Sequence, residues 1–223
     1  FCTGIGGGVL DCRQTLLAYG NRVGSVLVQD LRAPGSSFRL AGLHTEHVCA
    51  VRFCPQEEHV IASGSTDGSF KVFYARMVRC LFTGKHHSAA VKALAWSPFR
   101  RGQLATGGGV NDERVALWDL QRRAMLASRQ GGGQVCNVEF LSSKALLCTL
   151  GWPTHEVQFL DAGLEVRRRL TAHRDRVVYL AVNSGRTTFA TGSGDRTVKV
   201  WTMEEGSKGS EDAPAVLKCS FLR

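Results

Sequence analysis

Three histidines in the sequence are each followed by a hydroxyl residue and an aspartate, the residue types that form catalytic triads. In each set a valine lies four positions after the histidine, and an aromatic residue lies six positions after the aspartate. Because one arrangement recurs at one spacing, we interpret the sets as structural hydrogen-bonded chains that satisfy buried polar groups. The sequence therefore predicts a protein that is not an enzyme. The three sets are His44, Ser63 and Asp67; His87, Thr106 and Asp112; and His173, Thr191 and Asp195.

These sets belong to a longer repeat, in which an apolar run, a Ser/Thr-Gly pair and an aspartate turn precede a strand with β-branched and aromatic residues. The end of that strand recurs at Gln29, Phe73, Trp118, Phe159 and Trp201, with spacings of 44, 45, 41 and 42 residues. A period of about 40–45 residues is typical of WD repeats, each of which forms a four-stranded blade. No segment shows a sustained helical period. The sequence predicts an all-β WD40 β-propeller with five repeats, near residues 1–32, 40–74, 85–120, 131–161 and 170–202.

The repeats divide the chain into two parts. Residues 1–202 are predicted to form a partial WD40 β-propeller, and residues 203–223, which are polar and contain Gly and Ser, a flexible C-terminal tail. The glycine-rich residues 4–8 and 131–133 are predicted to be turns, because they lack the lysine and the following helix of a nucleotide site. We expect neither a cofactor nor a metal site.

The net charge of +9 is the bulk property that suggests an acidic partner. The arginines of residues 100–101, 122–123 and 167–169 lie at separate junctions between apolar runs, which favours solvated turns over a nucleic-acid-binding face. A basic WD-repeat scaffold in an RNA- or chromatin-associated complex stays open as the alternative function. The eight cysteines fall mostly in apolar runs, and we expect free thiols in a reducing compartment. No apolar run is long enough to cross a membrane.

Four stretches of the repeats resemble the Fizzy and Fizzy-related activators of the anaphase-promoting complex: residues 91–98 (VKALAWSP), 104–109 (LATGGG), 134–137 (QVCN) and 176–181 (RVVYLA). The resemblance runs from about residue 6 to residue 202. It implies that the five repeats are the third to seventh blades of a seven-bladed ring. It also implies a substrate-recognition activator of the anaphase-promoting complex/cyclosome ubiquitin ligase in the cytoplasm and nucleus, with ligase subunits and degron-containing cell-cycle proteins as partners and without membrane or nucleic acid.

The same resemblance implies which residues bind these partners. Gln134 and Arg176 match two polar residues with which the family holds a Lys-Glu-Asn degron on the top face of the propeller, where arginine can bind a carboxylate and glutamine can both donate and accept. Leu222 and Arg223 are similar to the family's terminal Ile-Arg pair, which docks on a helical-repeat subunit of the ligase. Arg196 stands where the family has an acidic residue that helps hold the arginine of the destruction-box degron, so like charges disfavour that degron here.

Overall fold

The computed structural model describes residues 9–33, 35, 37–40, 43–77, 79–204 and 215–222. Within these ranges the chain is built from β-strands and one 3-10 turn, η1 (Ala75–Met77). The predicted all-β WD40 propeller is confirmed, because the strands form five antiparallel four-stranded sheets. None of the helical segments in the described part of the chain has the length and hydrophobicity that a membrane-spanning helix needs.

In each sheet the four strands pair in chain order, so each sheet is a simple meander. The strands are β1 (Leu10–Arg13), β2 (Leu16–Gly20), β3 (Val26–Asp30), β4 (Ser37–Leu40), β5 (Val48–Phe53), β6 (Val60–Ser65), β7 (Ser69–Tyr74), β8 (Arg79–Lys85), β9 (Val91–Trp96), β10 (Gln103–Gly108), β11 (Arg114–Asp119), β12 (Ala124–Gln130), β13 (Val135–Phe140), β14 (Ala145–Leu150), β15 (Val157–Asp161), β16 (Val166–Leu170), β17 (Val177–Val182), β18 (Thr188–Ser193), β19 (Val198–Glu204) and β20 (Ala215–Leu222).

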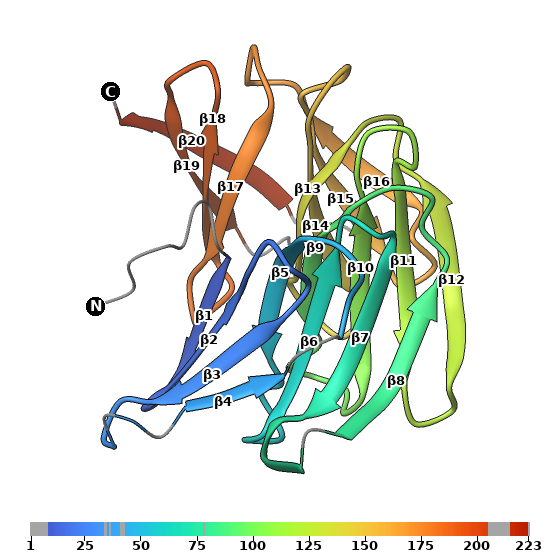
Figure 1. Cartoon of the computed structure of the whole chain (residues 1–223). Helices are drawn as coiled ribbons and strands as arrows, with labels where there is room; N and C mark the ends of the chain where they lie inside the picture. Colours follow the sequence, from blue (N-terminus) through green and yellow to red (C-terminus); the bar gives the residue numbers. More distant parts are fainter. Residues whose placement is uncertain are drawn as a thin grey trace.

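The five sheets are arranged around a centre, as Figure 1 shows. The first strand of each sheet contacts the first strand of the next, so β1, β5, β9, β13 and β17 form the inner layer. The fourth strands, such as β8 and β12, form the outer edges. The first residues of the inner strands therefore gather at one end of the central channel, and the last residues of these strands gather at the other end.

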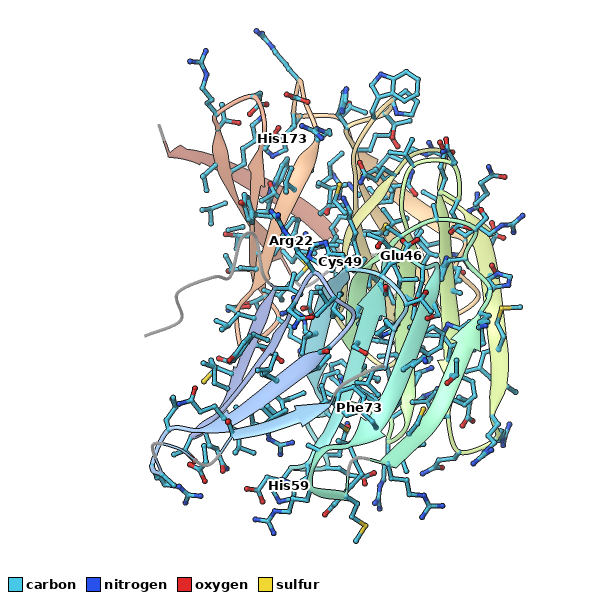
Figure 2. All side chains as sticks on the ribbon, in the orientation of Figure 1. Arg22, Glu46, Cys49, His59, Phe73 and His173 are labelled. Carbon is cyan, nitrogen blue, oxygen red and sulfur yellow. The ribbon has the colours of Figure 1, made fainter. Side chains whose placement is uncertain are left out.

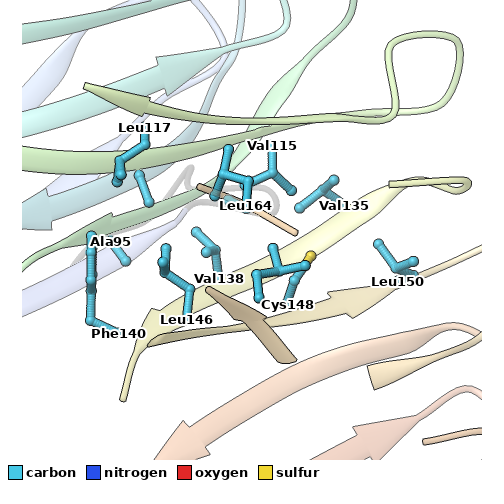
Figure 3. Close-up of a cluster of buried hydrophobic side chains, with 13 residues drawn as sticks. Ala95, Val115, Leu117, Val135, Val138, Phe140, Leu146, Cys148, Leu150 and Leu164 are labelled. Atoms are coloured by element: carbon cyan, nitrogen blue, oxygen red, sulfur yellow. The ribbon is translucent and has the colours of Figure 1, made fainter. Parts of the chain in front are cut away.

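The hydrophobic core lies between successive sheets. In the cluster of Figure 3, Val115 and Leu117 from β11 pack with Val138 from β13 and Leu146 from β14. Three similar clusters fill the remaining spaces between neighbouring sheets. A glycine on β6 allows this packing: a Cβ atom on Gly64 would lie 2.3 Å from the carbonyl oxygen of Val91 in the next sheet.

The fourth strand of each sheet was not marked by the repeat pattern, which ended at the aromatic residue of the third strand. The largest difference is at the C-terminal end, where residues 215–222 form β20 instead of part of a flexible tail. β20 pairs along β19, with Val198 opposite Leu222, because the outer backbone groups of β19 need hydrogen-bond partners. The predicted tail over 203–223 is therefore wrong for residues 203–204, which end β19, and for residues 215–222.

The predicted docking pair lies at the end of β20. Leu222 is paired in the sheet, and Arg223 lies outside the described residues. Docking of this pair on a ligase subunit stays a prediction.

The last sheet has an open face. Tyr179 on β17 is 73% exposed, whereas Ala93 and Leu94 on β9 are buried against neighbouring sheets. Leu10 on β1, at the other end of the arc of sheets, is 57% exposed. Exposed apolar strand faces promote association with other chains, so these two faces are the parts of the fold most prone to self-association.

Candidate functional site

The histidine sets form buried hydrogen-bonded chains inside three of the sheets. In the third sheet His87 Nδ1 lies 2.6 Å from Asp112 Oδ2, and His87 Nε2 lies 2.7 Å from Thr106 Oγ1. The indole of Trp118 donates to the same hydroxyl oxygen at 3.0 Å. The carboxylate places the imidazole proton on Nδ1, so the threonine hydroxyl donates to Nε2. Each polar atom has a partner, and the chain ties the turn to the strands.

The other two sets repeat this geometry. His173 Nε2 lies 2.8 Å from Thr191 Oγ1, which also accepts from the Trp201 indole at 2.9 Å. In the second sheet His44 Nε2 lies 2.8 Å from Ser63 Oγ, and Phe73 replaces the indole donor. The three hydroxyls are buried and already bonded, which supports the structural interpretation made from their recurrence.

The three imidazoles make the fold sensitive to acid. Burial lowers the pKa of His44, His87 and His173, although the facing aspartates act in the opposite direction. The unfolded chain therefore binds more protons than the native state below about pH 6.5, and stability falls as pH drops below that value. Burial would raise the pKa of Asp67, but its hydrogen bonds lower it to about 2, so its contribution is lost only at lower pH.

We expect the free energy of unfolding to fall steeply between pH 7 and pH 5, by up to about 4 kcal/mol per pH unit for the three histidines together. Urea unfolding followed by tryptophan fluorescence at a series of pH values measures this slope. In a His87→Gln variant the slope should fall by about one third, since each histidine contributes up to about 1.4 kcal/mol per unit. A stability that is flat over this range would contradict the role of the buried imidazoles.

The fourth sheet lacks this chain of bonds and has a different polar network. Cys148 stands where the second, third and fifth sheets have a serine or threonine hydroxyl, opposite Val138, and burial raises the pKa of its thiol. Near the same end of the sheet, Gln158 donates to Glu156 at 2.9 Å, and Arg169 donates to Glu156 at 3.2 Å. This sheet therefore holds the connection 151–156 by a carboxylate network instead of a histidine.

An extra residue bulges from four of the inner strands near their starts. The pairing register shifts there, which leaves Cys49, Lys92, Cys136 and Val178 without an opposite partner on the second strand of their sheets. A bulge redirects the side chain of the extra residue. Cys49 and Lys92 are among the residues that line a cavity of about 120 Å³ between the inner strands. The bulges thus build the mouth of the channel at the end where the inner strands begin.

Two cations act on one thiol at this mouth. Burial raises the pKa of Cys136 to about 11, and both Lys92 and Arg176 oppose that rise. Burial likewise raises the pKa of Cys49 to about 12, and Lys92 opposes it. The ammonium of Lys92 forms no ion pair with any residue that the structure describes. Lys92 and Arg176 therefore bring positive charge to this end of the channel, where Asp175 lies 3.9 Å from the Nε of Arg176.

The two predicted degron-binding residues lie on this end of the channel, each directly before an inner strand. Gln134 precedes β13 and is 9% exposed, and Cys136 reaches its carbonyl oxygen at 3.7 Å. Arg176 precedes β17 with its side chain 58% exposed, and its Nε lies 3.9 Å from Asp175. Because β13 and β17 are neighbouring inner strands, the structure places the predicted pair at the same end of the channel.

Sequence reasoning missed two neighbours of Gln134 and Arg176. Lys92 comes directly after the first valine of its repeat, and Gln134 comes directly before the matching valine of the next repeat. The register of the repeats therefore already indicated that Lys92 lies at the same end of the fold as Gln134. Trp152 is 63% exposed, and its carbonyl oxygen accepts from the Gln134 backbone at 3.1 Å. Nothing in the repeat pattern marked Trp152, because it lies in a connection of the fourth sheet, which departs from the pattern.

Three similar proteins have names that state a family or a function. The chain is 34% identical over 198 residues to WD repeat-containing protein srw1 of Schizosaccharomyces pombe, covering 88% of this chain and 35% of that protein. It is 30% identical to the APC/C activator protein CDH1 of Saccharomyces cerevisiae, covering 95% and 38%. It is 31% identical to Protein FIZZY-RELATED 2 of Arabidopsis thaliana, covering 96% and 44%. The chain thus spans less than half the length of these relatives.

Solved structures support the same fold. A chain in a crystal structure of the mitotic checkpoint complex superimposes with a TM-score of 0.83 at 28% identity, covering 88% of this chain and 61% of that chain. The computationally designed Ika8 protein has a TM-score of 0.69 at 22% identity, covering 87% and 57%, which shows likeness of fold alone.

Three segments, residues 39–73, 78–119 and 164–202, match the WD40 family described as WD domain, G-beta repeat. Together they make up just over half of the chain. The relatives confirm the resemblance to Fizzy-related proteins that the motifs predicted. The chain therefore belongs to the WD-repeat family, and within it the chain is related to the Fizzy and Fizzy-related proteins.

Proposed function

We propose that this chain is the degron-binding part of an activator of the anaphase-promoting complex, and that the channel mouth is its peptide site. The observation that carries the proposal is that Lys92, Gln134 and Arg176 stand at the starts of three neighbouring inner strands, β9, β13 and β17, with Gln134 mostly buried. The side-chain amide of Gln134 has no hydrogen-bond partner among the described residues. The relatives named as an APC/C activator and as Fizzy-related support the proposed role.

Each group at the mouth suits one part of a short polar peptide. The guanidinium of Arg176 and the ammonium of Lys92 bind a carboxylate such as that of the glutamate in Lys-Glu-Asn, by charge-assisted hydrogen bonds. The amide of Gln134 pairs with a second amide, as in the peptide's asparagine, because it both donates and accepts. The exposed indole of Trp152 gives the peptide an aromatic surface at the edge of the mouth.

Replacing Arg176 with alanine is expected to weaken binding of a Lys-Glu-Asn peptide by about 1.5–3 kcal/mol, the range for hydrogen bonds to charged groups. Lys92→Ala is expected to weaken it in the same direction. Titration of a fluorescently labelled peptide with each purified variant, followed by fluorescence anisotropy, measures both effects. The variants should unfold at the wild-type temperature, since both side chains are exposed and outside the core.

Arg122→Ala is the matched control, because Arg122 is an exposed arginine whose strand pair, β11 and β12, places it at the opposite end of the propeller. It should leave peptide affinity unchanged. Equal affinity of the wild type and the Arg176→Ala variant would reject the proposed site. If the protein binds RNA with an affinity that falls steeply with salt, and does not bind the peptide at all, the scaffold function is favoured instead.

A further inference from the structure

A second cavity lies at the other end of the propeller, between the second and third sheets. It has a volume of about 210 Å³ and is bordered by the turns after β5, β9 and β11 and by β8. The channel mouth, in contrast, is built from residues at the starts of the inner strands. Figure 2 shows the two ends: His59, from the turn between β5 and β6, lies at the bottom, and His173, which precedes β17, lies near the top.

The floor of this cavity is apolar and fixed in place. Leu81, Phe82, Trp96 and Leu120 line it and pack against the core between the two sheets. The Phe82 ring lies 6.1 Å from the ring of Trp118. The Trp96 indole donates at 3.1 Å to the carbonyl oxygen of a residue on β5, so its one polar group is already satisfied. The floor therefore presents carbon surface without an unmet hydrogen-bonding need.

The size of the cavity suits one bulky side chain. An apolar cavity of about 150 Å³ in another protein accommodates benzene. The 210 Å³ present here is therefore large enough for the side chain of leucine or phenylalanine from a partner. An apolar pocket with few polar groups at its border is the usual form of a ligand site.

The rim of the cavity carries a positive charge, that of Arg123, which is not paired with a carboxylate of the described residues. Glu57 borders the cavity, but Arg101 neutralises it with an Nε–Oε1 distance of 3.3 Å. Arg123 also borders the cavity, and it forms no ion pair with any residue in the described ranges, whereas its neighbour Arg122 pairs with Asp119. The turn holds Arg123 at a φ of 54°. The rim therefore carries one uncompensated positive charge beside an apolar floor.

We propose that this groove between the second and third sheets binds a short partner peptide with a bulky apolar residue and an acidic residue close to it. The apolar side chain enters the cavity against Phe82 and Trp96, and the carboxylate pairs with Arg123. This site is separate from the channel mouth, so one partner can be held at each end of the propeller. The proposal does not depend on the identity of the peptide at the mouth.

Selection from a random peptide library displayed on phage tests the groove, with the whole purified protein as bait and the tightest selected peptide as the probe. The selected peptides are expected to share an aromatic or aliphatic residue within about three positions of an acidic one, the spacing over which an extended peptide spans the cavity and its rim. Two variants then test where the probe binds. Gln121→Trp fills the cavity from its rim, and Arg123→Glu reverses the free charge.

Each variant is expected to weaken the affinity of the probe at least tenfold. Arg122→Glu, one residue away and outside the cavity, should weaken it less than threefold, and Arg176→Ala should leave it unchanged. Thermal unfolding of every variant tests whether the fold is intact. If Gln121→Trp is unstable, the affinity of Arg123→Glu for the probe decides the question. Selected peptides without an acidic residue, or a probe whose affinity is the same for wild type and Arg123→Glu, would overturn the proposal.

Discussion

Replacing Gly64 with alanine is expected to lower the free energy of unfolding by about 1–3 kcal/mol or more, the range for overpacked cores. The new Cβ atom would lie 2.3 Å from the carbonyl oxygen of Val91, which is closer than van der Waals contact allows. A backbone oxygen in a strand cannot rotate away as a side chain can. The second and third sheets must therefore separate along their inner edge. Urea unfolding of the variant measures the loss.

Gly192→Ala is the matched control for this change. Gly192 occupies the same place in the last sheet, but the atom nearest to its added Cβ is the Cβ of Tyr179, at 3.3 Å. Because Tyr179 is largely exposed, it can shift slightly at little cost. We expect less than half the destabilisation that Gly64→Ala causes. Equal losses in the two variants would show that close approach of the next sheet is not the cause.

Replacing Thr106 with valine is expected to cost about 2–6 kcal/mol, because it leaves two buried groups without a partner and each costs about 1–3 kcal/mol. These groups are the Nε2 of His87 and the indole N–H of Trp118, which now share the threonine hydroxyl. Valine fills the same volume, so the change removes hydrogen bonds and leaves packing almost intact. Chemical unfolding followed by circular dichroism measures the loss.

Thr106→Ser keeps the hydroxyl and serves as the control, with a loss expected to be well below that of the valine variant. The natural Ser63 in the second sheet already supports His44 in this way at 2.8 Å. If Thr106→Val is as stable as the wild type, the hydrogen-bonded chain does not hold the third sheet together, and the histidines need another explanation.

The repeat pattern predicted the parts of the fold that depend on buried and regularly spaced residues. Strands such as β11 and β19 alternate side chains between their two faces and contain Trp118 and Trp201, so their period appears in the sequence. The histidine sets were identified for the same reason, since one geometry repeats in three sheets. The resemblance, and not the period, pointed to Gln134 and Arg176, and the structure places these two residues at one end of the channel.

The parts that sequence reasoning missed lack that regularity. The outer strand β8 is mostly exposed or partly buried, so its composition is free to vary and gives no pattern. β20 follows a polar segment, and its place is set by the free edge of β19 instead of by its own residues. The bulge that redirects Lys92 depends on the pairing of two strands, and single-strand spacing does not record it.

The cores between sheets make each sheet depend on its neighbours more than on distant parts of the chain. A sheet in the middle shares a core with two others, whereas the last sheet shares one, with Val177, Phe189 and Trp201 packed against β14 and β15. Stability in such an array is close to a sum of unit and nearest-neighbour terms. The two end sheets, the first and the last, are therefore the least supported: we expect amide hydrogens of β17–β19 to exchange with solvent through local fraying, and those of β9–β11 to exchange only when the whole array opens.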